Sequence, residues 1–235
     1  MKQVITSLFF LLLSLTASAQ NGEFVGGDIS ILPLYETHNT GYRDTKGNNI
    51  DDLISWFVSE CGWNSFRVRL FVDPKEKNQK GETDHCVCQN IDFVKKLGKR
   101  IKDAGAYFVL DIHYSDTWAD PSSQILPASW SDCTTAAKKA DKVYSYTKEV
   151  LQTLKDAGAK PDFVQVGNET TYGMIGIKVF PYDHASNDWA GLTKVFSYGC
   201  KAVREVCPDA KIIIHTERSG VPGQTVYYYN KLKDA

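Results

Sequence analysis

The stretch Phe163-Val-Gln-Val-Gly-Asn-Glu169 is an apolar, β-branched run that ends on an amide followed by a carboxylate. Strands favour Val and Phe and disfavour Asn, Asp and Glu, so the Asn-Glu pair is locally unfavourable at a strand end. Departures from local preference concentrate at functional positions. The segment predicts a strand that ends at a functional carboxylate, against the alternative of a solvated Glu169 that only opens a loop.

Four further strand-like runs share this design and lie at residues 24–30, 65–71, 107–114 and 211–217. Segments with apolar residues at helical spacing separate the five runs, and glycines lie where helix C-caps are expected. The expected helices are 51–60, 91–104, 136–157 and 192–206, and the glycines are Gly62, Gly105 and Gly158. Alternating strands and helices indicate an α/β fold with a parallel sheet.

Two parallel architectures compete, the open doubly wound sheet and the closed (β/α)8 TIM barrel. A doubly wound nucleotide-binding protein has a glycine-rich phosphate loop after its first strand, and Gly26-Gly-Asp28 lacks that spacing. A polar residue instead ends every run: Asp28, Arg69, His113, Glu169 and His215. Because the chemistry of a TIM barrel gathers at the carboxyl ends of several strands, we predict the barrel.

The spacing of the runs also predicts how much of a barrel is present. Strands begin roughly every 47 residues, so eight units would need on the order of 380 residues, whereas 235 hold about five. We expect residues 20–235 to be the N-terminal part of a single (β/α)8 catalytic domain. Residues 1–19 have the basic start, apolar stretch and Ala17-Ser-Ala19 ending of a secretory signal peptide. A secreted, periplasmic or cell-surface protein is expected.

The composition restricts the classes of partner. Lys plus Arg (27) nearly balance Asp plus Glu (28), and no basic stripe is present, so neither a nucleic acid nor an anionic membrane surface is an expected partner. Beyond the signal, no segment approaches the ~18 apolar residues of a membrane span. A neutral partner is therefore expected.

The six cysteines are disulfide candidates in an exported protein. Cys200 and Cys207 are seven residues apart in a helical pattern, about 10 Å of rise, too far for a disulfide within an intact helix. The segment around Cys86 and Cys88 lacks the second ligand pair of a zinc site, so no metal is expected. A bridge from Cys86 or Cys88 to Cys133 is favoured.

Arg67 and Arg69 share one face of their expected strand, opposite Phe66, Val68 and Leu70. In a barrel mouth, a guanidinium such as that of Arg69 can hold a catalytic carboxylate ionised and oriented. An ordinary structural ion pair is the alternative.

The segment after the third strand combines His113 with Asp116 and Trp118 in one loop. An indole offers a flat apolar surface to a pyranose ring, and His and Asp make the directed hydrogen bonds that fix its hydroxyl groups. Each residue alone has a structural explanation, but together they favour a carbohydrate site.

Glu169 is then the candidate general acid/base of a glycosidase, with Asn168 holding the hydroxyl group next to the reacting carbon. A second carboxylate is required, about 5.5 Å away in a retaining enzyme. Glu217 is a local candidate, although His215 shares its face and could equally bind substrate. Strict strand alternation places Asn168 and Glu169 on opposite faces, so the strand must end or bulge before them.

Five motifs together resemble glycoside hydrolase family 53, the arabinogalactan endo-β-1,4-galactanases. They are Gly26-Gly-Asp-Ile-Ser30, Phe66-Arg-Val-Arg-Leu70, His113-Tyr-Ser-Asp-Thr-Trp-Ala-Asp-Pro121, Gly167-Asn-Glu169 and Ile213-Ile-His-Thr-Glu217. The long block that begins at His113 is highly specific, whereas Gly167-Asn-Glu169 alone matches many barrel glycosidases.

This resemblance implies a TIM barrel and retaining hydrolysis of β-1,4-galactan, the side chains of pectic arabinogalactan. It implies Glu169 as acid/base, Asn168, Arg69 and His215 as binding or supporting residues, and no cofactor. The family's nucleophile is a glutamate on the seventh strand, so we expect it beyond residue 235 and expect this fragment alone to be inactive. The complete enzyme is expected to be a monomer.

Two other functions remain open from the sequence. One is a different barrel glycosidase, such as a mannanase or xylanase. The other is an inactive, truncated protein that binds galactan.

Overall fold

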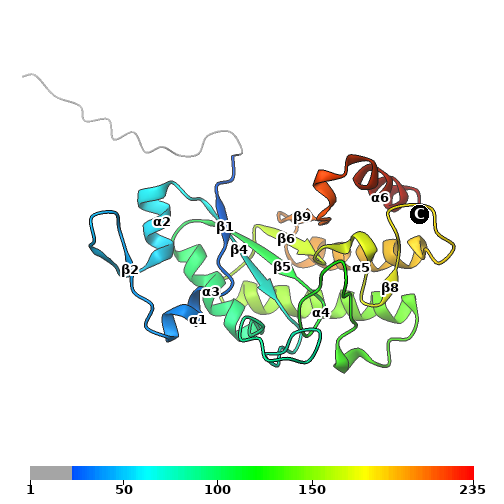
Figure 1. The fold of residues 1–235 in the computed structure, drawn as a ribbon, viewed down its shortest axis with the longest axis horizontal. Helices are drawn as coiled ribbons and strands as arrows, with labels where there is room; N and C mark the ends of the chain where they lie inside the picture. Colours follow the sequence, from blue (N-terminus) through cyan, green and yellow to red (C-terminus); the bar gives the residue numbers. More distant parts are fainter. Residues whose placement is uncertain (1–22) are drawn as a thin grey trace, which may run out of the picture.

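The computed structural model describes residues 23–235, so the expected signal peptide lies outside the described part of the chain. Five parallel strands form one sheet in sequence order (Figure 1). They are β1 (Gly26–Asp28), β4 (Ser65–Leu70), β5 (Tyr107–Ile112), β6 (Phe163–Val166) and β9 (Lys211–Ile213). Helices connect the strands, which confirms the α/β prediction and gives a partial (β/α)8 barrel.

Six helices accompany the sheet within these residues: α1 (Leu32–Thr37), α2 (Leu53–Cys61), α3 (Ile91–Asp103), α4 (Ala136–Asp156), α5 (Trp189–Val206) and α6 (Pro222–Asp234). Side-chain oxygens of Asp52, Asn90, Thr135 and Asp188 cap the first turns of α2, α3, α4 and α5. Gly62 ends α2 in the left-handed conformation, at φ 68°, as its C-cap position predicts.

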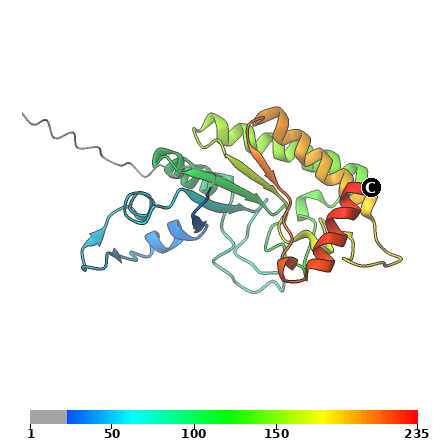
Figure 2. The same cartoon turned by 90° about the horizontal axis from the view of Figure 1, so that it is seen from above.

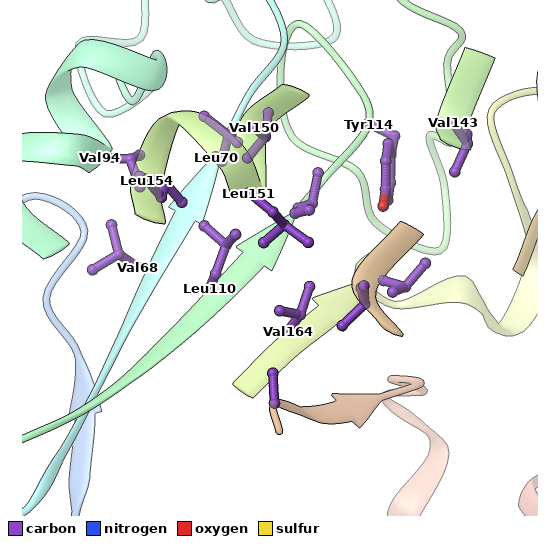
Figure 3. Packing of buried hydrophobic residues seen from close by; sticks show 14 of the residues in the cluster. Val68, Leu70, Val94, Leu110, Tyr114, Val143, Val150, Leu151, Leu154 and Val164 are labelled. Atoms are coloured by element: carbon purple, nitrogen blue, oxygen red, sulfur yellow. The ribbon is translucent and has the colours of Figure 1, made fainter. Parts of the chain in front are cut away.

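The outer face of the sheet packs against helices and forms the core. Val68 and Leu70 of β4 and Leu110 of β5 are fully buried there, and Leu151 and Leu154 of α4 cover them (Figure 3). Helices α4 and α5 lie side by side on this face (Figure 2). The apolar face is the one that strand alternation predicted.

The inner face of the sheet is polar. Arg69 of β4, Asp111 of β5 and Gln165 of β6 are register partners along a single row across the sheet. Arg67 lies on the same face, two residues earlier in β4. These polar groups face away from the helix layer, toward the interior of the partial barrel.

Several elements differ from the sequence prediction. β1 and β9, the two edge strands of the sheet, are only three residues long. Helices α1 and α6 were not predicted; each starts with a proline in its first turn rather than with a polar cap. Two short hairpins were also missed: β2 (Tyr42–Arg43) with β3 (Asn49–Ile50), and β7 (Gly173–Met174) with β8 (Ile177–Lys178).

The favoured disulfide is not formed. All six cysteines are free. Cys86 and Cys88 lie in the loop between β4 and α3, whereas Cys133 is buried in the core just before α4. Burial raises the pKa of Cys88 to about 11, which keeps this thiol protonated at neutral pH.

The described residues contain neither a candidate membrane-spanning helix nor a candidate metal cluster. None of the helices within residues 23–235 combines the length and apolarity needed to cross a membrane. Within the same residues, no group of three or more His, Cys, Asp or Glu side chains is arranged to hold a metal ion.

Candidate active site

The strand that carries the Asn-Glu pair ends before the pair begins. β6 stops at Val166, and Gly167 and Glu169 have left-handed backbones, with φ of 83° and 48°. Strict alternation no longer applies after Val166, so Asn168 and Glu169 both turn toward the inner side of the sheet. A Cβ on Gly167 would lie 2.7 Å from the Met174 sulfur, so both space and φ require glycine there.

A cleft of about 540 Å³ opens at the carboxyl ends of the strands. It brings together six residues that the sequence singled out: Arg69, His113, Trp118, Asn168, Glu169 and His215. The remaining lining residues are Arg67, Ala119, Asp120 and Gln165. The strand ends thus converge as the barrel prediction required.

Arg67 is the central cation beneath this cleft. Its Nη2 lies 2.5 Å from the fully buried Asp111 Oδ2 and 3.0 Å from Asn168 Oδ1, while its Nη1 lies 2.6 Å from Asp28 Oδ2. One guanidinium therefore ties β1, β5 and the end of β6 together. Such charge-assisted, multidentate contacts fix the position of each partner.

Two hydrogen bonds fix the orientation of the His113 ring. Its Nδ1 accepts the backbone N–H of Ala119 at 3.0 Å, so the ring proton is on Nε2, which donates to Asp111 Oδ2 at 3.0 Å. The side chain is almost completely buried. His113 therefore positions the loop that starts at Ala119 and contributes one wall of the cleft.

Trp118 has one face covered and its nitrogen bound. The Arg69 guanidinium lies 4.3 Å from the ring centroid, and the indole N–H donates to Asp84 Oδ2 at 2.8 Å. Arg69 also reaches Asp28 Oδ1 at 3.4 Å. Arg69 thus contacts both the Trp118 ring and the Asp28 carboxylate.

Glu169 has an electrostatic environment that favours its protonated form. The hydrogen bonds that the described residues make with Glu169 go to its backbone, from Gln124 Nε2 to O and from N to His215 Nδ1. Burial raises the pKa of its carboxyl group, and the negative charges of Glu217 and Asp120 raise it further. Raised carboxyl pKa values are typical of general acids.

Asn168 is anchored from several sides. Its Oδ1 lies 3.1 Å from both Gln165 Nε2 and His215 Nδ1, and its Nδ2 donates to the Ala119 carbonyl at 2.7 Å. Burial, helped by the positive charge of Arg67, lowers the pKa of His215, which leaves this ring neutral at pH 7. A neutral imidazole adds no charge to the cleft; its Nδ1 donates to Asn168 Oδ1 in one tautomer and accepts the Glu169 N–H in the other.

The structure places the other predicted residues outside the cleft lining. Asp116 braces two loops, because its carboxylate accepts the backbone N–H groups of Asp73 (3.1 Å) and Ala128 (2.8 Å). Asp28 lies behind Arg67 and accepts the Ser30 N–H at 2.9 Å. Glu217 follows β9; its Oε2 accepts from Thr171 Oγ1 at 2.7 Å and its Oε1 lies 2.9 Å from Arg218 Nε.

The sequence analysis assigned no role to four residues of this network: Arg67, Asp111, Asp120 and Gln165. A period of two would have found three of them, since Arg67, Asp111 and Gln165 each share a strand face with a predicted site residue. Asp120 belongs to the motif that begins at His113, but no spacing or pattern in the sequence pointed to a role for it. It binds Gln79 Nε2 at 2.7 Å.

Comparisons with known proteins identify the family of the chain. The model for the family described as "Glycosyl hydrolase family 53" matches residues 24–235. The endo-beta-1,4-galactanase of Bacillus subtilis is 34% identical over 198 residues, which are 83% of this chain and 42% of that protein. The probable arabinogalactan endo-beta-1,4-galactanase A of Neosartorya fischeri is 31% identical, over 98% of this chain and 60% of its own length.

Solved structures show the same relationship. A GH53 catalytic domain from Ignisphaera aggregans superposes with a TM-score of 0.76 at 26% identity, covering 89% of this chain and 55% of that one. A fungal beta-1,4-galactanase gives a TM-score of 0.76 at 27% identity, covering 90% and 58%. The chain therefore spans about half the length of these relatives. It belongs to glycosyl hydrolase family 53.

Proposed function

We propose that the protein acts in the internal hydrolysis of β-1,4-galactan, by a retaining double displacement in which Glu169 is the general acid/base. The observation that carries the proposal is the position of Glu169: a partly buried carboxyl group in the strand-end cleft, with its pKa raised. The names of the relatives as galactanases support the choice of substrate.

In this mechanism Glu169 first gives its proton to the glycosidic oxygen as the bond to the leaving sugar breaks. Burial and the nearby charges of Glu217 and Asp120 favour the protonated state from which the step begins. Glu169 then accepts a proton from the water that attacks the glycosyl-enzyme. Loss of the Glu217 or Asp120 charge would make Glu169 a stronger acid and a weaker base.

The retaining reaction also requires a nucleophilic carboxylate on the opposite side of the sugar. Glu217 lies outside the cleft lining, where its Oε2 accepts a hydrogen bond from Thr171 Oγ1 and its Oε1 lies beside Arg218 Nε. The proposal therefore assigns the nucleophile to a carboxylate outside residues 23–235. A protein that lacked this carboxylate would bind galactan without cleaving it.

Trp118 and Asn168 are the proposed substrate contacts. The indole, held by Arg69 and Asp84, offers its remaining edge and face to a galactose ring. Asn168 Nδ2 donates one of its two hydrogens to Ala119, and the second is free for a sugar hydroxyl group. The signal-like N-terminus supports a secreted, periplasmic or cell-surface location.

The test compares polysaccharides, using protein produced from the full-length gene. Release of reducing ends is measured on β-1,4-galactan, mannan and xylan, for the wild type and for Glu169→Gln. We expect cleavage of galactan and a loss of about 10²- to 10⁴-fold in kcat for the variant. Preferential cleavage of mannan or xylan would overturn the substrate, and full activity of Glu169→Gln would overturn the acid/base.

A further inference from the structure

The turn that carries Glu169 has an unfavourable backbone conformation. Glu169 lies in the left-handed region, at φ 48° and ψ 49°, which residues with a Cβ rarely adopt. It leads directly into the 3-10 helix η2 (Thr170–Tyr172). Such a conformation persists only where neighbouring contacts hold it, and a shift of the backbone here would move the carboxyl group in the cleft.

The first and last residues of η2 bind the segment that follows β9. The N–H of Thr170 donates to the His215 carbonyl at 3.0 Å. At the other end of η2, the phenol oxygen of Tyr172 accepts a hydrogen bond from Arg218 Nη2 at 2.6 Å. The turn that follows the proposed acid is therefore docked on the end of the neighbouring strand.

The hydroxyl group of Thr170 extends this docking to α6. Thr170 is completely buried, and its Oγ1 lies 2.9 Å from the His215 carbonyl oxygen and 2.8 Å from the phenol oxygen of Tyr228. A threonine hydroxyl has one hydrogen and a carbonyl can only accept, so Thr170 donates to His215. The Tyr228 hydroxyl must therefore donate to Thr170.

Tyr228 is held in the position that this donor requires. It belongs to α6, the red helix of Figure 1, and is completely buried. Its ring meets the Trp189 ring edge-on, with the two centroids 5.6 Å apart. Burial raises the pKa of the Tyr228 phenol, which keeps the hydroxyl group protonated and able to donate.

We propose that Tyr228 is a positioning residue for the acid/base: through Thr170, its hydroxyl group holds the turn that directs the Glu169 carboxyl group into the cleft. Tyr228 contacts the residue next to the acid, and the proton donor itself stays free to meet the substrate. A small displacement of a proton donor from the glycosidic oxygen slows the proton transfer. This assignment rests on the proposed function and adds a residue outside the cleft that supports it.

The test separates the position of the acid from the integrity of the fold. With protein from the full-length gene, kcat/KM is measured for β-1,4-galactan and for a dinitrophenyl β-galactobioside, whose leaving group departs without protonation. We expect Tyr228→Phe, which removes only the hydroxyl group, to lower kcat/KM about tenfold on galactan and less than about twofold on the activated substrate. The retained rate on the activated substrate also shows that the variant is folded.

The preceding residue of α6 supplies a matched control. The hydroxyl group of Tyr227 donates to the exposed Asp183 Oδ1 at 2.6 Å, away from η2. Tyr227→Phe removes the same group from the same helix and should change kcat/KM on neither substrate.

Variants of Thr170 test the path of the effect. Thr170→Val removes the hydroxyl group and should lower kcat/KM on galactan at least as much as Tyr228→Phe. Thr170→Ser keeps the hydroxyl group and should retain wild-type values. If Tyr228 acts through Thr170, the double variant Thr170→Val with Tyr228→Phe should lose no more than Thr170→Val alone.

The outcomes distinguish this inference from the proposed function. Equal losses on both substrates for Tyr228→Phe, no loss on galactan, or multiplied losses in the double variant would overturn the positioning role and leave the proposed function intact. A wild type that cleaves the dinitrophenyl substrate but not galactan would overturn the proposed function and this inference together.

Discussion

The Nη2 of Arg67 lies 2.5 Å from Oδ2 of Asp111, and Asp111 is completely buried. The same carboxylate accepts hydrogen bonds from His113 Nε2 and Gln165 Nε2. Three donors, from β4, from β6 and from the residue that follows β5, thus converge on one buried anion below the cleft. Satisfied buried networks of this kind fix a unique arrangement, and they become costly when one member is removed.

Replacement of Asp111 by alanine is therefore expected to destabilise the fold. The variant leaves the hydrogen-bond donors of Arg67, His113 and Gln165 without their shared acceptor, and we expect a loss of about 3–5 kcal/mol in the free energy of unfolding. Urea denaturation measures it. Asp103→Ala, which breaks an exposed pair with Lys99, should cost less than about 0.5 kcal/mol. Equal losses in the two variants would contradict the role of the network.

Gly167 is expected to tolerate alanine poorly. Its φ is +83°, and an added Cβ would lie 2.7 Å from Met174 Sδ and 2.8 Å from Thr170 Cγ2. Gly105 is a matched control, with φ of +76° and open space around the Cβ position. Gly105→Ala should cost about 1–2 kcal/mol from the backbone alone, and Gly167→Ala about 1–3 kcal/mol more from the clash. Chemical denaturation of both variants gives this difference directly.

Asp84 is expected to act on substrate binding through Trp118. Removal of its carboxylate in Asp84→Ala leaves the indole N–H unbound and the ring free to turn, so KM for galactan should rise about three- to tenfold while kcat changes little. Asp84→Asn keeps an oxygen acceptor and should restore most of the affinity. A fall in kcat with KM unchanged would show that Asp84 acts on the chemistry instead.

The raised pKa of Glu169 predicts the sign of a pH effect on stability. A carboxyl group whose pKa is higher in the folded state stabilises the fold below its unfolded pKa, near the ordinary 4.5, and this contribution is lost as the pH rises through the folded pKa. Glu169→Gln does not ionise, so it should gain stability relative to the wild type as the pH rises across this window. Thermal unfolding from pH 3.5 to 8 tests it.

Glu205 supplies the control of opposite sign. Hydrogen bonds from Tyr144 and Lys148 lower the pKa of this exposed carboxyl group. Its contribution to stability is present above the unfolded pKa and lost as the pH falls, so Glu205→Gln should lose stability relative to the wild type at neutral pH. If the stability of both variants relative to the wild type rose with pH, or fell with pH, the assigned environments of Glu169 and Glu205 would be contradicted.

The sequence predicted the sheet because its strands are local and strongly patterned. Val68 and Leu70 alternate with Arg67 and Arg69, and this period of two defines both the strand and its buried face. It also predicted which strand ends converge, since parallel strands place their carboxyl ends at one edge. No pattern in the sequence predicted the left-handed backbone at Glu169. This backbone conformation decides where the carboxylate points.

The residues that the sequence did not predict depend on contacts between distant segments. Arg67 meets Asn168, 101 positions away, and Trp118 meets Asp84 across two loops. Asp116 looked equivalent to Trp118 in the sequence, yet it binds the backbone of Asp73 and Ala128. The packing of the loops decides which residue of one motif lines the cleft and which one only stabilises the loops.

The dependence of activity on the leaving group tests the role of Glu169 most directly. In the Glu169→Ala variant, kcat/KM is measured for galactan and for a dinitrophenyl β-galactobioside, whose leaving group departs without protonation. If Glu169 is the acid, the variant should lose about 10²- to 10⁴-fold on galactan and less than about tenfold on the activated substrate. Equal losses on the two substrates would show that Glu169 does not protonate the leaving group.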